Sequence, residues 1–365
     1  MRVSRRRVWV AAPVLALAAM ALTLVPVDAL AATASTTSQS PAGCASSHVL
    51  LLGSYPSEVS ANIDREVLDP DQPTVIDGVD FYAGTLSGSR VVIAIAGPAP
   101  AETYATTVLA LKHFVCTSAI VFSGTAGGGG ESGLGDVTAP GAWTRNYGVT
   151  FFPVSTAALA VAREIETKTD TELATSAPVN DGPCLCQGVF YRMQAVPILR
   201  TPRLVVGGYG TTYGGESDAC IAQGGMLEGC NPCPPDSGAA AVSINVPISF
   251  GANSSNAVAQ AASLAASTGT LVGDAHALLS HESAPPPTAL AETSGGPSYI
   301  ADDQQTTGAL EAADAYHVPF IAFRGISDTS AVGNLWPFEW LVFQQLAADN
   351  AATAARLWIQ RWDAR

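Results

Sequence analysis

The chain has 365 residues, of which 48% are hydrophobic and 13% are charged. This composition excludes an intrinsically disordered protein, and the length is sufficient for one large domain or two smaller ones. Acidic residues outnumber basic residues by 31 to 17, which gives a formal net charge of -14. So acidic a surface repels a phosphate backbone, and we expect no nucleic-acid partner.

The N-terminus has the layout of a secretory signal peptide. Four arginines precede an apolar run, and Ala29-Leu30-Ala31 then supplies a cleavage site of small residues. The run is long enough for an uncleaved membrane anchor, but Pro13 and Pro26 argue against that alternative. We expect residues 1–31 to be removed on secretion and residues 32–46 to form a flexible leader, without membrane attachment of the mature protein.

Seven cysteines follow the expected cleavage point, as in exported proteins with disulfides. Cys116 lies alone in an apolar run and is interpreted as a buried free thiol. The other six would form three disulfides of undetermined pairing; they are Cys44, Cys184, Cys186, Cys220, Cys230 and Cys233. The last five include two closely spaced pairs that could instead bind zinc. An oxidising compartment favours disulfides, so we expect no metal.

Segments of strand type and helix type alternate after the leader. The predicted strands are His48–Gly53, Phe81–Leu86, Arg90–Ala96, Ser118–Phe122, Arg203–Val206 and Val318–Phe323. The predicted helices are Ala101–Phe114, Ser155–Glu166, Gln304–Tyr316 and Phe338–Trp362. Ser87-Gly88-Ser89 indicates a hairpin turn, and Ser155 is an expected helix N-cap.

This alternation is typical of a three-layer α/β fold, in which helices flank a mixed, mostly parallel central sheet. We expect one such domain over residues 47–365. Residues 177–300 interrupt the alternation and accumulate cysteine, proline and small residues. We interpret that stretch as a long Cys-rich insertion.

Several predicted strand ends carry more than a plain turn, and in α/β sheets ligands bind beyond the carboxyl ends of strands. Glu58 follows the first strand, Gly97 follows the hairpin, and Asp328 follows the last strand. Ser123–Gly130 is a predicted glycine-rich loop whose N–H groups could meet a ligand. Together, the two acids could supply the protonated and ionised carboxyl groups of acid–base chemistry. Singly, they could be a surface acid and a helix cap, and the glycines a flexible loop.

Seven motifs follow one another in a characteristic order. They are Gly53–Val59, Gly78–Gly88, Ala96-Gly97, Ser123–Gly128, Gly135-Asp136-Val137, Val318-Pro319-Phe320 and Arg324–Asp328. In this order they resemble the purine and uridine phosphorylase superfamily. More narrowly, the chain is similar to the methylthioadenosine and adenosylhomocysteine nucleosidases and their secreted, storage-type relatives, over residues 48–155 and 300–362.

The resemblance implies a nucleoside phosphorylase-like fold and cleavage of the N-glycosidic bond of a purine nucleoside, without a cofactor. Asp328 would protonate the leaving purine, and Glu58 would activate a water for attack on the sugar. The substrate-binding residues expected from the resemblance are Gly97, Thr125, Ala126, Gly127, Tyr209, Gln305 and Arg324. Relatives build sites near subunit contacts, which favours a homo-oligomer.

By the resemblance, the base-contacting strand of the family would correspond to either Leu204–Tyr209 or Leu271–His276, and we prefer the first. Gln304-Gln305 stands where the family has a Met-Glu pair whose glutamate grips the ribose hydroxyls. An amide forms hydrogen bonds but brings no negative charge, although Asp303 could supply one after a shift of two residues. Ala96 also replaces a serine common in the family.

Phe122 stands where related phosphorylases carry a phosphate-binding arginine, which favours hydrolysis over phosphorolysis. We therefore expect a secreted purine nucleosidase. A phosphate-dependent nucleoside phosphorylase is one alternative. A non-catalytic nucleoside-binding or storage-type protein is the other, and Gln304-Gln305 is the feature in its favour.

Overall fold

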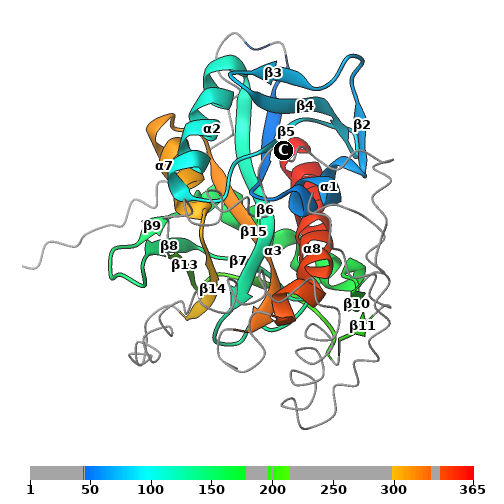
Figure 1. Ribbon diagram of the computed structural model, residues 1–365, viewed down its shortest axis with the longest axis vertical. Coiled ribbons are helices and arrows are strands. Elements are labelled where there is room, and N and C mark those ends of the chain that lie inside the picture. Colours follow the sequence, from blue (N-terminus) through cyan, green and yellow to red (C-terminus); the bar gives the residue numbers. More distant parts are fainter. Residues whose placement is uncertain (1–43, 45, 178–195, 199, 214–297, 330–337) are drawn as a thin grey trace, which may run out of the picture. The chain divides into compact units, whose positions relative to one another are not determined.

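The computed structural model describes residues 44, 46–177, 196–198, 200–213, 298–329 and 338–365 (Figure 1). It contains a mixed central sheet with helices on both faces, as the sequence predicts. The expected signal peptide and nearly all of the leader lie outside the described residues, as do most of the insertion and its five cysteines. None of the helices in the described part of the chain is long and apolar enough to cross a membrane.

The described ranges contain helices and strands in mixed order. The strands are β1 His48–Gly53, β2 Glu66–Leu68, β3 Thr74–Ile76, β4 Val79–Leu86, β5 Ser89–Ile95, β6 Thr117–Gly128, β7 Val137–Ala139, β8 Ala142–Arg145, β9 Phe152–Pro153, β10 Ser176–Ala177, β11 Val196–Pro197, β12 Leu204–Val206, β13 Tyr209–Thr212, β14 Tyr299–Asp303 and β15 Phe320–Thr329. The helices are α1 Pro56–Ile63, α2 Pro100–His113, α3 Thr156–Glu172, α7 Thr306–Ala315 and α8 Phe338–Asp363. The main path through the sheet is β2-β4-β5-β1-β6-β14-β13-β8-β9.

Strand β6 is the centre of the sheet because three strands pair with it. β1 runs parallel to its first half, from Thr117 to Phe122, and β15 runs parallel to it from Ile120 to Gly128. β14 pairs antiparallel with its end, at Gly127 and Gly128. Since β15 occupies one edge of β6, β1 and β14 must share the other. Between them the β6 edge carries no strand among those described.

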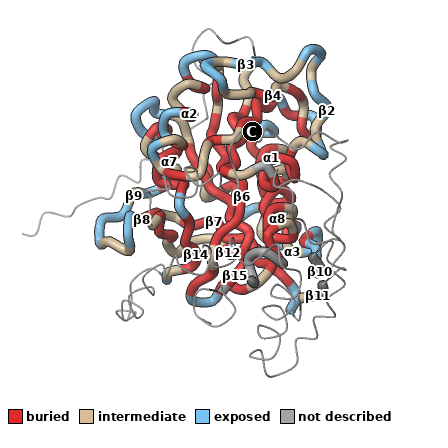
Figure 2. Tube along the Cα trace, viewed as in Figure 1, coloured by how far each residue is buried: buried red, intermediate tan, exposed pale blue. Residues whose placement is uncertain are grey.

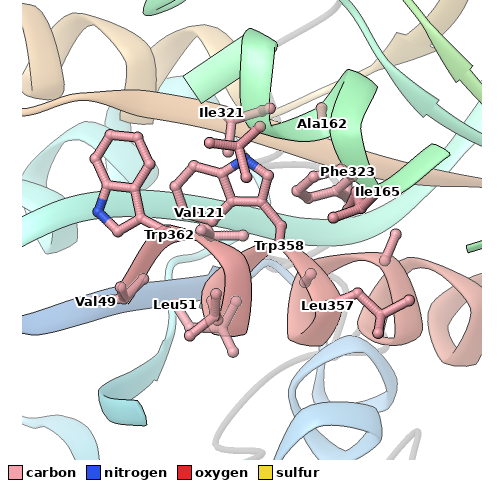
Figure 3. Packing of buried hydrophobic residues seen from close by; sticks show 14 of the residues in the cluster. Val49, Leu51, Val121, Ala162, Ile165, Ile321, Phe323, Leu357, Trp358 and Trp362 are labelled. Carbon is pink, nitrogen blue, oxygen red and sulfur yellow. The ribbon is translucent and has the colours of Figure 1, made fainter. Parts of the chain in front are cut away.

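Two apolar layers cover the sheet. Along β1, Val49 and Leu51 face α3 and α8, whereas Leu50 and Leu52 face α2 and α7. A strand buried on both faces needs such an uninterrupted apolar run. Figure 2 shows the resulting buried interior, and Figure 3 shows the α8 side, where Trp358 packs among strand side chains.

The predicted strands and helices are confirmed, with shifts at their ends. The hairpin joins β4 to β5 through Ser87 and Gly88, both at positive φ. Ser155 caps α3 by accepting a hydrogen bond from the Ala158 amide at 3.3 Å. The largest difference is that β6 continues to Gly128, so most of the predicted loop Ser123–Gly130 is strand. The expected insertion also contributes β12 and β13 to the sheet.

The prediction for Cys116 is wrong, because this residue forms a disulfide with Cys44, with 5.8 Å between the two Cα atoms. The sheet explains the pairing. β1 and β6 are parallel neighbours whose first residues, His48 and Thr117, are register partners. Residues just before each strand therefore lie at the same edge, 72 positions apart in sequence.

We predict that replacing Cys44 and Cys116 together by alanine lowers the free energy of unfolding. Losing a cross-link that closes a loop of this length costs about 4 kcal/mol, because the unfolded chain regains its freedom. Urea denaturation of the oxidised proteins measures the effect, with exposed Ser46→Ala as the control. Equal stability of the double variant and the control would show that this disulfide does not form.

Candidate active site

Glu58 lies in the first turn of α1, directly after β1, and only 1% of it is exposed. Its Oε2 accepts hydrogen bonds from the amides of Ser54 at 2.6 Å and Tyr55 at 3.4 Å. Its Oε1 accepts from the Thr125 amide at 2.7 Å and from the Thr125 hydroxyl at 2.9 Å. The carboxylate thus occupies the stretch of the β6 edge that lies between β1 and β14.

The protonation of Glu58 reflects opposing influences. Burial raises the pKa of Glu58, because a charged carboxylate is poorly solvated there. The positive charge of Arg324 and the hydrogen bonds from Thr125 and Ser54 act in the opposite direction. Such a carboxyl group can exchange a proton nearer to neutral pH than an ordinary surface glutamate.

Arg324 is fully buried on β15 and lies across β6. Its guanidinium carbon is 4.1 Å from the centre of the Phe122 ring, and its Nη2 is 2.6 Å from Asp303 Oδ2. Nε and Nη2 also donate to the Thr306 hydroxyl, at 3.0 and 2.7 Å. The remaining nitrogen, Nη1, has no hydrogen-bond partner in the described part of the chain. A Cβ on Gly124 would clash with Nη1 and lie 2.6 Å from Glu58 Oε2, so the two groups adjoin.

Asp303 connects this arginine to helix α7. Besides the ion pair, its Oδ1 accepts hydrogen bonds from the Thr212 hydroxyl at 2.8 Å and from the amides of Gln305 at 3.1 Å and Thr306 at 3.2 Å. Both carboxylate oxygens of Asp303 therefore have partners. The negative charge of Asp303, which from the sequence alone is a possible ribose contact, interacts instead with Arg324 and the N-terminus of α7.

Asp328 lies near the end of β15, beside Gly127 of β6, and is 5% exposed. Its Oδ2 is 3.3 Å from the position of a Cβ on Gly127, and Glu58 contacts the side chain of Thr125. Glu58 also lies against Gly124, whose Cβ would point to the opposite face of the strand from that of Gly127. The structure therefore brings Glu58 and Asp328 to the same end of β6, at Gly124 and Thr125 and at Gly127 respectively.

The same contacts explain why the glycines belong to a strand. A Cβ on Gly124 would overlap Glu58 and Arg324, and a Cβ on Gly127 would overlap Asp302. These positions lack side chains because buried charged groups take the space above them. The sequence shows the glycines but not the groups that cover them, which is why it predicts a loop.

The other expected substrate-binding residues are distributed around this centre. Gly97 follows β5 with a φ of +96°, a conformation that favours glycine. The side-chain amide nitrogen of Gln305 donates to the Pro98 carbonyl at 3.0 Å, joining the ends of β5 and β14. The Ala126 side chain belongs to the apolar layer on the α7 side, away from the face of Thr125 and Gly127.

Tyr209 belongs to an aromatic cluster on β13, β14 and the segment after β8. Its ring centre is 5.7 Å from that of Tyr299, which is 6.1 Å from that of Tyr147. Tyr147 stacks on Tyr213 at 5.8 Å. The second expected base-contacting strand, Leu271–His276, lies outside the described residues.

Sequence reasoning missed Asp302, the register partner of Gly127 on β14. Its Oδ2 accepts a hydrogen bond from the Tyr147 hydroxyl at 2.9 Å, and it is 5% exposed. Burial and the charge of Asp302 raise the pKa of Tyr147, which therefore stays neutral and donates. The available signal was the pair of acids at the end of the segment Tyr299–Asp303.

The uncharacterized protein Rv2293c of Mycobacterium tuberculosis is 34% identical to this chain over 192 residues, which are 50% of this chain and 76% of that protein. This chain belongs to the Rv2293c family. No established family model matches it.

A solved 5'-methylthioadenosine/S-adenosylhomocysteine nucleosidase of Colwellia psychrerythraea, in complex with adenine, aligns with this Rv2293c family member with a TM-score of 0.50. It is 14% identical, and the alignment covers 87% of this chain and 96% of that one. A futalosine hydrolase of Helicobacter pylori aligns with a TM-score of 0.49 and 12% identity over 86% and 97% of the two chains. The likeness to the Colwellia enzyme establishes a shared fold.

We predict that Asp303→Asn destabilises this member of the Rv2293c family by about 3 kcal/mol or more, because it leaves the buried Arg324 charge without its ion-pair partner. The amide can still accept hydrogen bonds at the start of α7, which isolates the effect of the charge. Exposed Asp314→Asn, on the same helix, is the matched control in urea denaturation. A loss no greater than that of the control would contradict the assigned pair.

Proposed function

We propose that this chain is a secreted nucleosidase that hydrolyses the N-glycosidic bond of a purine nucleoside. The observation that carries the proposal is the convergence of Glu58 and Asp328 on the same end of β6, over the residues from Gly124 to Gly127. The nucleosidase-like fold agrees with it. The signal-peptide pattern of residues 1–31 supports secretion.

Glu58 is the group that activates water in this proposal. Its carboxylate is fixed by four hydrogen bonds and adjoins Nη1 of Arg324, which has no hydrogen-bond partner among the described residues. A water placed between them can donate one proton to Glu58 and accept a hydrogen bond from Arg324. This orients its lone pair, and Glu58 takes the proton as the water oxygen bonds to the anomeric carbon.

Asp328 is the general acid. As the bond between the anomeric carbon and the purine nitrogen breaks, its electron pair stays with the purine, which takes the proton of Asp328 and leaves neutral.

Electrostatics around Arg324 favour water over phosphate as the nucleophile. The guanidinium is already paired with Asp303, and Glu58 lies on its free side. A phosphate dianion there would face the Glu58 carboxylate, which repels it. Phe122, packed against the guanidinium, adds no charge.

A non-catalytic, secreted nucleoside-binding protein is the second candidate, and Gln305 is the observation that favours it. Its amide nitrogen is used in a contact with the Pro98 carbonyl rather than held free for a sugar hydroxyl. Such a protein would bind nucleosides without cleaving them.

We predict that the mature protein releases free base from at least one of adenosine, inosine and methylthioadenosine, at a rate independent of phosphate. Asp328→Asn removes the proton donor and Glu58→Gln removes the proton acceptor, so each should lower kcat by about 10²–10⁴-fold. Base release followed by chromatography measures this, with Asp314→Asn as the control.

Wild-type kcat in Asp328→Asn would defeat the assignment of the acid. Release only with phosphate would indicate a phosphorylase. Nucleoside binding without release, measured by calorimetry, would indicate the non-catalytic alternative.

A further inference from the structure

Glu66 begins β2, a strand of three residues at one end of the sheet that pairs antiparallel with β4. Its register partner, Leu86, is buried in the apolar layer on the α8 side. Directly paired residues of antiparallel strands point to the same face, so the Glu66 side chain points toward this layer too. Ile63 of α1 and Tyr82 of β4 pack against the same layer. An acid therefore lies where an apolar residue is expected.

The carboxyl group of Glu66 lies over Gly84 of β4. A Cβ on Gly84 would lie 2.6 Å from Glu66 Oε1, so a side chain at position 84 would displace the carboxyl group. Both carboxyl oxygens of Glu66 are buried, and neither has a hydrogen-bond partner among the described residues. An ionised carboxylate there would lack both water and donors, whereas the neutral acid avoids most of that cost.

The charged groups that face Glu66 do not compensate for its ionisation. They are Asp69, in the segment after β2, and Arg90 on β5. Arg90 is already bound to both carboxylate oxygens of Asp69, at 2.8 and 2.5 Å. Burial raises the pKa of Glu66 to about 8, the charge of Asp69 adds to the rise, and the charge of Arg90 opposes it.

Besides these groups, the elements packed against β2 carry a few titratable residues. They are Asp80 and Tyr82 of β4, Glu58 of α1, and Asp64 and Arg65 between α1 and β2. Burial, and then the charge of Asp80, raise the pKa of Tyr82 to about 12, so this residue stays neutral. Arg65, the cation of this set, pairs with Asp349 on α8 at 3.6 Å. The surroundings of Glu66 thus favour its protonated form.

We propose that Glu66 is a pH-sensitive latch for β2, whose side chain holds the strand on the sheet while it keeps its proton over Gly84. An ionised Glu66 reaches water by leaving this position, and because β2 is a short strand at the edge of the sheet, the strand detaches from β4 with it. The latch belongs to the fold and is independent of the proposed nucleosidase activity.

The direction of the pH dependence follows from the two states. In detached β2, Glu66 is in water and titrates at its ordinary pKa of 4.5, whereas in the seated position it titrates at a pKa of about 8. Between these values the detached state is ionised and the seated state keeps its proton. Detachment should therefore become about tenfold more frequent for each pH unit and level off above the higher value.

Hydrogen exchange of the β2 amides in the full mature chain tests the latch. Wild type and Glu66→Gln are compared at each pH, so that the intrinsic pH dependence of exchange cancels. Opening of β2 in the wild type should increase relative to Glu66→Gln by about 100-fold between pH 5 and pH 7. Exposed Glu131→Gln, the control, should behave as the wild type does. The same pH dependence in wild type and Glu66→Gln would overturn the proposal.

Carbon NMR of the chain, labelled with 13C at its glutamate carboxyl groups, observes the proton itself. We expect a signal that titrates near pH 8 and is absent in Glu66→Gln. Glu58→Gln identifies the signal of the other buried glutamate. Titration of Glu66 at its ordinary value would contradict the latch.

Asp69→Asn gives a second reading if Glu66→Gln folds poorly. This variant removes the neighbouring negative charge and releases Arg90 from its ion pair. The Glu66 signal should therefore titrate at lower pH than in the wild type, and β2 should open less at neutral pH. Titration and opening that are both unchanged in Asp69→Asn would count equally against the proposal.

Discussion

The site depends on one side chain, that of Glu58, which takes the place of a neighbouring strand along part of β6. On one edge of β6, β1 ends at Gly53 and β14 begins to pair only at Gly127. The Glu58 carboxylate fills the interval and accepts the Thr125 amide as a neighbouring strand would. The Thr125 amide, which has no strand partner beyond the end of β1, thus fixes the orientation of the Glu58 carboxylate. Buried backbone amides must form hydrogen bonds for the chain to fold, so the same contact serves both the fold and the site.

A second constraint is the balance of buried charge. Glu58, Asp302, Asp303 and Asp328 are buried acids near the end of β6, and the buried Arg324 forms its ion pair with Asp303. Burying charge without compensation is costly, so the surplus must be met by hydrogen-bond donors or by bound protons. Glu58 accepts four hydrogen bonds, Asp302 accepts one from the Tyr147 hydroxyl, and Asp328 accepts one from the Ser327 hydroxyl.

The sequence predicted the fold well because the fold depends on apolar periodicity. The run Val49–Leu52 is buried on both faces, and the hairpin at Ser87 and Gly88 has a turn signal of its own. The order of motifs also placed Glu58 and Asp328 near strand ends, where the structure brings them together.

The remaining features of the fold and the site depend on contacts between residues that are far apart in the sequence. The Cys44–Cys116 disulfide joins two positions that only the parallel pairing of β1 and β6 makes neighbours. From the sequence alone, the glycine at position 127 favours a loop, because the sequence does not show that carboxyl groups from other strands lie where its side chain would be. Asp302 belongs to none of the sequence motifs, and its place in the site comes from its register with Gly127.

Glu58 and Asp328 are proposed to act on one nucleoside from the same end of β6. A crystal structure of the Glu58→Gln variant soaked with adenosine decides whether they do. We expect intact adenosine beside Gly127, with the purine against Asp328 and the anomeric carbon directed toward residue 58. Adenosine bound elsewhere, or in contact with only one of these two residues, would contradict the proposal.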